Sequence, residues 1–187
     1  MMNTLIINGS PRKNGGTSAL VRALSAELPG DVHVVDTYYA NVSPCLDCRH
    51  CWEERGCVLQ DEMQDIYRRI DEADCIVLAS PIYFAELTGS ILNWASRLQY
   101  LFASARFRKD PVIEKKRRCG VLLLVDGGQG EYEVAEAMGR RLLRTMGAPC
   151  GEMLYYSGTD FPGREDPLQD PHVQEKLREI VAYMTAE

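Results

Sequence analysis

The fold of this chain is indicated near its start by the stretch TLIINGSPRKNGGTS, residues 4–18. It opens on a short apolar run, residues 4–7, of the kind that forms a strand buried on both faces of a sheet. A loop rich in glycine and hydroxyl groups follows and leads into a segment with the apolar spacing of a helix. In an α/β sheet such a loop lies at the carboxyl end of a strand and at a helix N-terminus, where free N–H groups favour an anion.

This loop is neither of the two common nucleotide-binding loops. It does not end in Gly-Lys-Ser/Thr, as a Walker loop does, and it lacks the Gly-x-Gly-x-x-Gly spacing of dinucleotide-binding proteins. We therefore expect it to bind a single phosphate. On these residues alone, a plain polar turn with Thr17 or Ser18 as the helix N-cap is an equally good interpretation.

Further apolar runs bring the expected number of strands to five. They cover residues 32–35, 75–79, 121–125 and 153–156. Helical apolar spacing is found in residues 20–28, 63–70, 87–102, 134–146 and 173–184. Strands that alternate with helices in this way predict an α/β fold with a parallel, doubly wound sheet and right-handed crossovers. A length of 187 residues predicts one domain over residues 1–187.

A second loop strengthens the case for a ligand site. The sequence SPIYF, residues 80–84, directly follows the third apolar run. In the flavodoxin strand order, strands one and three flank the point where the order reverses, and ligands bind there. A proline-stiffened turn with two aromatic side chains suits a flat ring, which favours such a ligand over a loop whose aromatics only cover the core.

Four of the seven cysteines are close together in the chain. Cys45, Cys48, Cys51 and Cys57 lie in the cysteine-rich segment at about residues 40–60, and the first three follow one another at steps of three. Four soft thiolates at this spacing favour an iron-sulfur cluster, because zinc usually takes its ligands as two separated pairs. Empty thiols, an oxidised pair and zinc are the alternatives.

Composition and charge exclude other classes of protein. A formal net charge of -6 argues against a nucleic-acid partner. No apolar run approaches the ~20 residues of a membrane span, and residues 1–5 lack the features of a signal peptide, so we expect a cytoplasmic protein without a membrane partner. In that reducing compartment we expect no disulfide framework. Cys75, Cys119 and Cys150 then act as small buried hydrophobic residues.

Taken together, the motifs resemble those of the NAD(P)H-dependent FMN reductase and iron-sulfur flavoprotein family of the flavodoxin-like superfamily, over nearly the whole chain. The resemblance is carried by NGSPRKN (residues 8–14) with Thr17-Ser18, Pro44-Cys45 through Cys57, DEM (61–63), SPIYF (80–84) with Thr88-Gly89, and Asn93-Trp94 with Arg97. It implies a flavodoxin-like three-layer sandwich whose five-stranded parallel sheet has the order 2-1-3-4-5. Two positions depart from the family pattern: Gly16 stands where Asn is frequent, and Ser96 where Asp commonly precedes the Arg.

The resemblance also implies the cofactors and their sites. The FMN phosphate would lie on Ser10, Arg12, Asn14, Gly16, Thr17 and Ser18. The flavin ring would lie against Pro81, Ile82, Tyr83 and Phe84 on one side and Asp126, Gly127 and Gly128 on the other. A 4Fe-4S cluster would be held by Cys45, Cys48, Cys51 and Cys57.

The activity implied is that of an FMN-dependent oxidoreductase. It would pass electrons from NAD(P)H or a ferredoxin to a quinone, a small organic acceptor or another carrier. No catalytic side chain is expected, because the flavin carries the redox chemistry. The alternatives are a flavodoxin-type electron carrier, a plain FMN reductase without a cluster, and a phosphate-binding regulatory module.

The resemblance further implies a homodimer or a dimer of dimers. Within residues 87–102, the apolar side chains of Trp94, Leu98, Leu101 and Phe102 spread around more than one helix face, as at a partner surface. The alternative is that residues 104–111 fold back over this helix.

Overall fold

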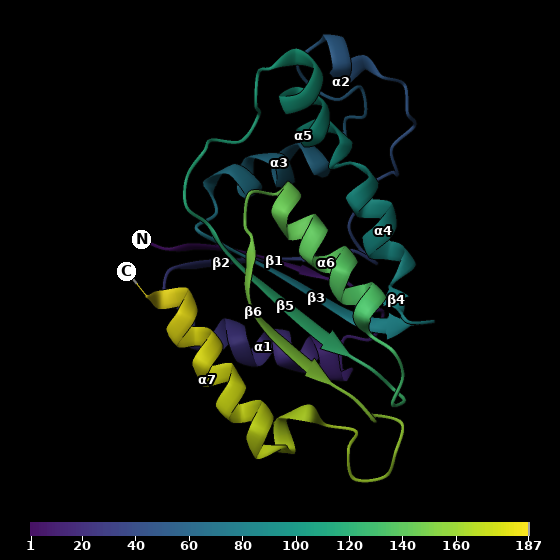
Figure 1. Cartoon of the computed structure of the whole chain (residues 1–187), viewed down its shortest axis with the longest axis vertical. Helices are drawn as coiled ribbons and strands as arrows, with labels where there is room; N and C mark the ends of the chain where they lie inside the picture. Colours follow the sequence, from purple (N-terminus) through teal and green to yellow (C-terminus); the bar gives the residue numbers. More distant parts are fainter. Residues whose placement is uncertain (187) are drawn as a thin grey trace.

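The computed structural model describes residues 1–186 and is built around a central parallel sheet (Figure 1). The parallel strands are β1 (Asn3–Asn8), β2 (Asp31–Asp36), β3 (Cys75–Tyr83), β5 (Cys119–Val125) and β6 (Cys150–Tyr156). Their order is β2-β1-β3-β5-β6, which confirms the predicted order 2-1-3-4-5 and the flavodoxin-like fold. A short strand, β4 (Glu86–Leu87), pairs antiparallel with the end of β3 and makes six. It was not predicted, because two residues leave no periodic pattern.

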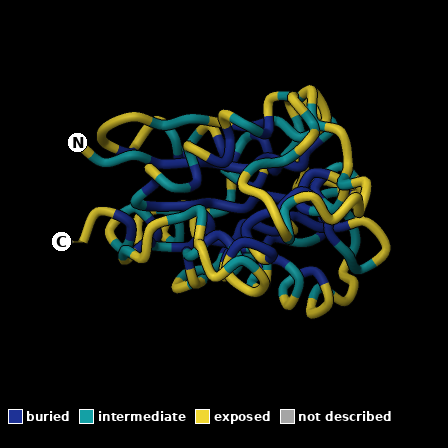
Figure 2. Tube along the Cα trace, turned by 90° about the horizontal axis from the view of Figure 1, so that it is seen from above, coloured by how far each residue is buried: buried dark blue, intermediate teal, exposed yellow. Residues whose placement is uncertain are grey.

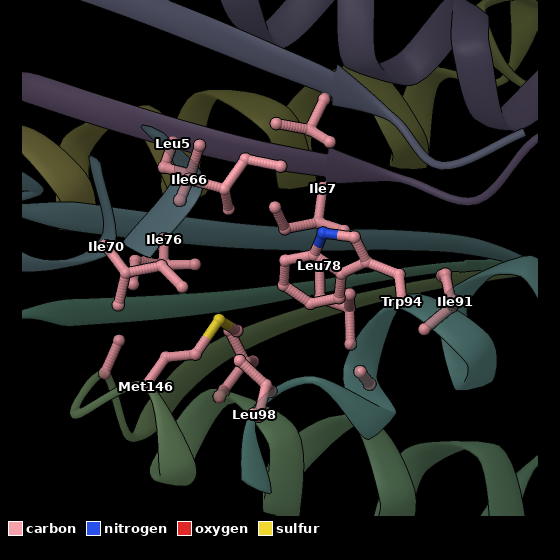
Figure 3. Close-up of a cluster of buried hydrophobic side chains, with 14 of the residues drawn as sticks. Leu5, Ile7, Ile66, Ile70, Ile76, Leu78, Ile91, Trp94, Leu98 and Met146 are labelled. Atoms are coloured by element: carbon pink, nitrogen blue, oxygen red, sulfur yellow. The ribbon is translucent and has the colours of Figure 1, made fainter. Parts of the chain in front are cut away.

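Helices cover both faces of the sheet (Figure 1). One layer is formed by α1 (Gly16–Glu27) and α7 (Pro171–Thr185), and the other by α3 (Met63–Glu72), α4 (Gly89–Ser96) and α6 (Glu133–Thr145). Successive strand residues point to opposite faces, so Ile6 packs with the first layer and Leu5 and Ile7 with the second. Figure 3 shows the buried side chains between the sheet and the second layer, with Leu5 and Ile7 among them. Figure 2 shows the buried strands running through the middle of the molecule.

The helix expected over residues 87–102 is divided in the structure. The first residue of the expected helix, Leu87, belongs to β4, and α4 follows. After an interruption come α5 (Gln99–Ala103) and the π-helix η1 (Ser104–Arg108). The interruption is a tight turn, in which the N–H groups of Arg97 and Leu98 each donate to a carbonyl three residues back. The single-helix prediction was therefore wrong, because apolar spacing does not reveal a change of hydrogen-bond step.

The apolar face of this segment belongs to the chain's own core. Trp94, Leu98 and Leu101 are buried, whereas Phe102 is half exposed. Phe107 of η1 folds back and meets Phe102 edge to face, with the ring centroids 6.0 Å apart. The interpretation of these side chains as a partner surface was wrong for Trp94, Leu98 and Leu101, which are buried within the chain. The folded-back segment contacts Phe102 through Phe107.

Two cysteines that were expected to have no chemical role form a disulfide. Cys75 and Cys119 are direct partners in the parallel register of β3 and β5, and their Cα atoms lie 4.6 Å apart. This separation falls within the range that a disulfide spans. The expectation of unpaired buried thiols was wrong here, because strand register cannot be read from the spacing of two cysteines 44 residues apart.

Across residues 1–186, no helix is both long enough and apolar enough to cross a membrane.

Candidate functional site

A cavity of about 210 Å³ opens at the carboxyl ends of the parallel strands. We call it the strand-end cavity. It is lined by the loop after β1 (Ser10, Pro11, Arg12, Gly15, Gly16, Thr17), the end of β3 (Pro81, Ile82, Tyr83), the end of β5 and its loop (Val125, Asp126, Gly127, Gly128) and the loop after β6 (Thr159, Asp160). Four segments far apart in the sequence therefore form one site.

The N-terminus of α1 faces this cavity without a side-chain cap. Gly15 is the N-cap residue, in an extended conformation, and no side-chain cap hydrogen bond is made there. The alternative with Thr17 or Ser18 as the N-cap is wrong, because both residues lie inside the helix. The first N–H groups of a helix have no partner within the helix, so this end can bind an anion.

Thr17 and Ser18 differ in how they relate to the strand-end cavity. Thr17 lines the strand-end cavity, whereas Ser18 does not. The Ser18 hydroxyl donates to the carbonyl oxygen of Arg12 at 2.9 Å and accepts from the Asn8 amide at 3.3 Å. Ser18 therefore holds the loop after β1 in shape.

The loops after β1 and β3 are tied together by Thr88. Its hydroxyl donates to the carbonyl oxygen of Gly9 at 3.0 Å, and its N–H donates to the Ser80 hydroxyl at 3.2 Å. Thr88 and Ser80 are fully buried. Two walls of the cavity are thus held relative to each other by hydrogen bonds of the chain itself.

Phe84 points away from the strand-end cavity. β3 and β4 pair through Tyr83 and Glu86, so Phe84 and Ala85 form a two-residue turn. Both have positive φ, 53° and 62°, and the Phe84 side chain is fully exposed. The tight turn directs Phe84 into solvent, whereas Tyr83, one residue earlier, lines the cavity.

The remaining wall is formed where the loops after β5 and β6 meet. The Asp126 carboxylate accepts from the N–H groups of Gly128 and Gly130, at 3.1 and 3.0 Å. The Asp160 N–H donates to the carbonyl oxygen of Gly127 at 2.9 Å. A Cβ atom on residue 127 would come within 2.4 Å of the Asp160 carboxylate, so the Asp160 side chain would have to move to admit it.

Thr159 and Asp160 were not among the predicted site residues. The only signal in the sequence was the length of the segment after the last strand, about residues 157–170, since long loops in compact domains are often functional.

A second, smaller cavity of about 30 Å³ is lined by all four clustered cysteines. We call residues 45–57 the cysteine loop; it contains the short helix α2 (His50–Glu53). Burial raises the pKa of the Cys51 thiol, and the neighbouring thiols of Cys45, Cys57 and Cys48 raise it further. The four cysteines thus line one cavity, while their role as cluster ligands stays a prediction.

Side chains outside the cysteine loop hold it in place. The Ser96 hydroxyl accepts from the Cys45 N–H at 2.8 Å. The Arg108 guanidinium donates to the carbonyl oxygens of Cys51 and Glu54, and the Tyr100 hydroxyl accepts from the Gly56 N–H at 3.1 Å. Ser96, where the family commonly has Asp, thus contacts the cysteine loop of its own chain.

Arg97 lies beneath the same loop and is paired with Asp61. The distance from Arg97 Nη1 to Asp61 Oδ2 is 2.6 Å, and both side chains are buried. Burial raises the pKa of Asp61, but the hydrogen bonds from Arg97, Ser43 and Met63 and the Arg97 charge together outweigh it and hold that pKa below its usual value. Asp61 also accepts from the Met63 N–H at 3.1 Å, at the start of α3, whose N-cap residue is Glu62.

The four thiols do not converge on a single point in this conformation. Within the described residues 1–186, no three or more His, Cys, Asp or Glu side chains are arranged as a set of metal ligands. The number and chemistry of the donors nevertheless suit an iron-sulfur cluster, since such clusters are held by sets of four cysteines.

Comparison with known proteins places the chain in a family. Residues 2–157 match the family model described as NADPH-dependent FMN reductase. The chain belongs to this family. Among its curated relatives, an iron-sulfur flavoprotein of Archaeoglobus fulgidus is 28% identical to this chain over 154 residues. The match covers 80% of this chain and 66% of that protein. An iron-sulfur flavoprotein of Clostridioides difficile is 29% identical over 181 residues, 94% of this chain and 74% of that protein.

Coverage of these relatives is incomplete. An iron-sulfur flavoprotein of Methanocaldococcus jannaschii is 36% identical over 93 residues, and the match spans 48% of each chain. The chain therefore spans between about half and two thirds of the length of the first curated relatives it matches.

Solved structures agree on the fold. The NAD(P)H:quinone oxidoreductase from Methanothermobacter marburgensis superposes with a TM-score of 0.70 at 16% identity, covering 100% of this chain and 98% of that one. An FMN-dependent NADH-azoreductase from Bacillus anthracis, in complex with FMN, has a TM-score of 0.59 at 17% identity and covers 99% and 98%.

The strand-end cavity of this family member brings together most of the residues predicted to bind FMN. All of them line it except Asn14, Ser18 and Phe84. Asn14 is exposed, Ser18 is used within the loop and Phe84 is displayed by the turn. An open site with an uncapped helix N-terminus on one side and Tyr83 on another suits a ligand with one phosphate and a flat ring.

Proposed function

We propose that this chain is an FMN-dependent oxidoreductase that takes electrons from NAD(P)H or a ferredoxin and gives them to a quinone, a small organic acceptor or another carrier. The observation that carries the proposal is the strand-end cavity, in which the uncapped N-terminus of α1 lies opposite Tyr83 and the loop after β5. Ser10, Arg12, Gly16 and Thr17 would hold the phosphate. Pro81 to Tyr83 and Asp126 to Gly128 would orient the ring. FMN itself supplies the hydride and one-electron chemistry when it is bound.

The test is binding followed by turnover. Purified protein freed of flavin should quench FMN fluorescence in a titration, bind riboflavin more weakly, and then oxidise NADH or NADPH in the presence of a quinone. Binding of FMN without any oxidation of NAD(P)H would favour a flavodoxin-type carrier. A protein that binds neither flavin would contradict the proposal and favour a phosphate-binding regulatory module.

We further propose that the cysteine loop holds a 4Fe-4S cluster through Cys45, Cys48, Cys51 and Cys57. Support comes from the four thiols around one cavity and from relatives that are named iron-sulfur flavoproteins. Anaerobically purified protein should contain iron and sulfide and absorb broadly in the visible range. Cys48→Ala should abolish that absorbance and leave FMN bound, because the strand-end cavity contains no residue of the cysteine loop.

Cys150→Ala is the matched control, since Cys150 is also a free cysteine but lies outside the cysteine loop. It should keep both iron and flavin. Stopped-flow measurements should then show slower reduction of a one-electron acceptor in Cys48→Ala, with flavin reduction little changed. Wild-type protein without iron would contradict the cluster and leave a plain FMN reductase with a thiol-rich loop.

We also propose a homodimer or a dimer of dimers, which rests on the family resemblance. Light scattering at micromolar concentration should give a mass of two or four chains, and a monomer mass would contradict it.

A further inference from the structure

Arg97 is a fully buried cation that binds both arms of the cysteine loop. Arg97 is the C-cap residue of α4, and its side chain is 1% exposed. Nη1 donates to the carbonyl oxygen of Ser43, before the first cysteine, and to Asp61, after the last. Nη2 donates to the Leu59 carbonyl oxygen at 3.4 Å and lies 3.5 Å from Cys57 Sγ.

The contact with Cys57 distinguishes Arg97 from an arginine that only fastens a loop. Arg118 is equally buried and offers the comparison, because its guanidinium binds Asp71 and two carbonyl oxygens and no thiol. Arg97 lines the cysteine cavity, and Arg118 does not. Arg97 therefore brings a buried positive charge to one of the four sulfur atoms.

This placement has a consequence for charge. A buried cation is costly unless it is paired, and one carboxylate, Asp61, pairs with Arg97 in the described structure. Four thiolates in the same cavity would add negative charge on the side of Cys57. Hydrogen bonds to cluster sulfur atoms and the net charge nearby are two of the factors that set the potential of an iron-sulfur cluster.

We propose that Arg97 is the positioning residue that sets the electron affinity of the cluster in the cysteine loop, acting through Cys57. The inference rests on the proposed cluster. Reduction adds one electron to the cluster, with no bond formed or broken and no proton required, and the electron comes from an external one-electron reductant. The added negative charge is stabilised by the Arg97 guanidinium and destabilised by the Asp61 carboxylate on its far side.

The proposal predicts shifts of opposite sign for the two partners. Arg97→Lys shortens the side chain, so it loses the approach to Cys57 while it can still pair with Asp61, and the cluster becomes harder to reduce. Asp61→Asn removes the neutralising charge and makes the cluster easier to reduce. A residue that only fastens the loop would not shift the cluster potential of the two variants in opposite directions, whatever it does to their stability.

The experiment is an anaerobic dithionite titration of the iron-loaded proteins with redox mediators, followed by electron paramagnetic resonance. At a fixed potential, the ratio of reduced to oxidised cluster should fall about tenfold in Arg97→Lys, which corresponds to about 59 mV for a one-electron couple. It should rise in Asp61→Asn. Arg118→Lys is the control and should match the wild type.

An iron-loaded Arg97→Lys variant with the wild-type potential would overturn the inference and leave the proposed function intact. If that variant does not fold, Asp61→Asn decides: a rise supports the inference and an unchanged or lower ratio overturns it. Iron-free wild-type protein would overturn both the inference and the cluster, while the FMN titration would still test the flavin site by itself.

Discussion

Thr17 lies in the first turn of α1, whose N-terminus is uncapped, and lines the strand-end cavity. If the FMN phosphate binds there, Thr17→Ala removes a hydrogen bond to a charged group, which is worth about 1.5 to 3 kcal/mol. FMN should then bind roughly 10- to 150-fold more weakly in a fluorescence titration. Riboflavin, which lacks the phosphate, should bind as it does to the wild type.

Ser18→Ala provides the contrast for this prediction. Because the Ser18 hydroxyl is bound to Arg12 and Asn8 and lies outside the cavity, its loss should affect FMN and riboflavin alike. An equal loss of both ligands in Thr17→Ala would contradict the phosphate assignment.

Asp61 makes the stability of the chain depend on pH. Its pKa is below the ordinary value in the folded protein, so its contribution is complete above the unfolded pKa of about 3.9 and is lost as the pH falls through the folded pKa. Asp61→Asn should destabilise the protein at pH 7 by about 3 kcal/mol, because it leaves Arg97 without its carboxylate. In thermal melts the gap to the wild type should narrow below about pH 4. A gap that stays constant between pH 7 and pH 3 would contradict this role of the ion pair.

The turn between β3 and β4 is an element whose sequence opposes its conformation. Phe84 and Ala85 both have positive φ, where Asn and Gly are favoured in a two-residue hairpin turn. The double substitution Phe84→Asn/Ala85→Gly should therefore stabilise the protein by about 1 to 2 kcal/mol. For a domain of this size that corresponds to a rise in Tm of roughly 2 to 8 °C.

Phe84→Ala separates the backbone effect from the loss of an exposed ring. It removes the aromatic side chain but keeps a residue that disfavours positive φ, so its Tm should stay near that of the wild type or fall. A rise in Phe84→Ala equal to that of the double variant would show that the exposed ring, and not the backbone, limits stability.

Elements with strong periodicity could be predicted from the sequence. The five parallel strands were found, because each contains an apolar run. The runs of the central strands, such as residues 121–125, are buried on both faces, whereas the edge strands β2 and β6 are partly exposed. β4 and α2 were missed, because two and four residues are too short to show a period. The division of the helix at Arg97 was missed because it involves contacts that form only in the fold, such as the hydrogen bond from the Tyr67 hydroxyl to the Arg97 carbonyl oxygen, 30 residues away.

In the candidate sites, too, the residues that belong to a local sequence pattern could be predicted, and those brought in only by tertiary contacts could not. Glycine-rich loops directly after strands, such as residues 9–18, were found through the place that a parallel sheet gives them. Thr159 and Asp160 were missed, because only the tertiary approach of their loop to Gly127 brings them to the cavity. Arg97 was noticed as part of a motif, but its contacts with Cys57 and Asp61 join residues 40 and 36 positions apart.

At the scale of the whole molecule, the Cys75–Cys119 disulfide joins two central strands at the end of the sheet opposite the strand-end cavity. It closes a loop of 44 residues that contains the β3–β4 turn, α4, α5 and η1. Restricting an unfolded chain in this way typically stabilises the folded state by about 2 to 4 kcal/mol. A reductant should therefore lower the free energy of unfolding by that amount in urea titrations, and flavin binding should be unchanged below the transition because the bond is far from the site.

The double variant Cys75→Ala/Cys119→Ala separates this bond from the thiols of the cysteine loop, which a reductant also reaches. It should be less stable than the oxidised wild type and should no longer respond to the reductant, since the remaining cysteines are free thiols in the structure. Alkylation of the unfolded wild type should label two more cysteines after reduction than before. A wild type whose unfolding curve and labelling are the same with and without reductant would contradict the disulfide, and β3 and β5 would then be held together by their parallel hydrogen bonds and the buried residues on both faces.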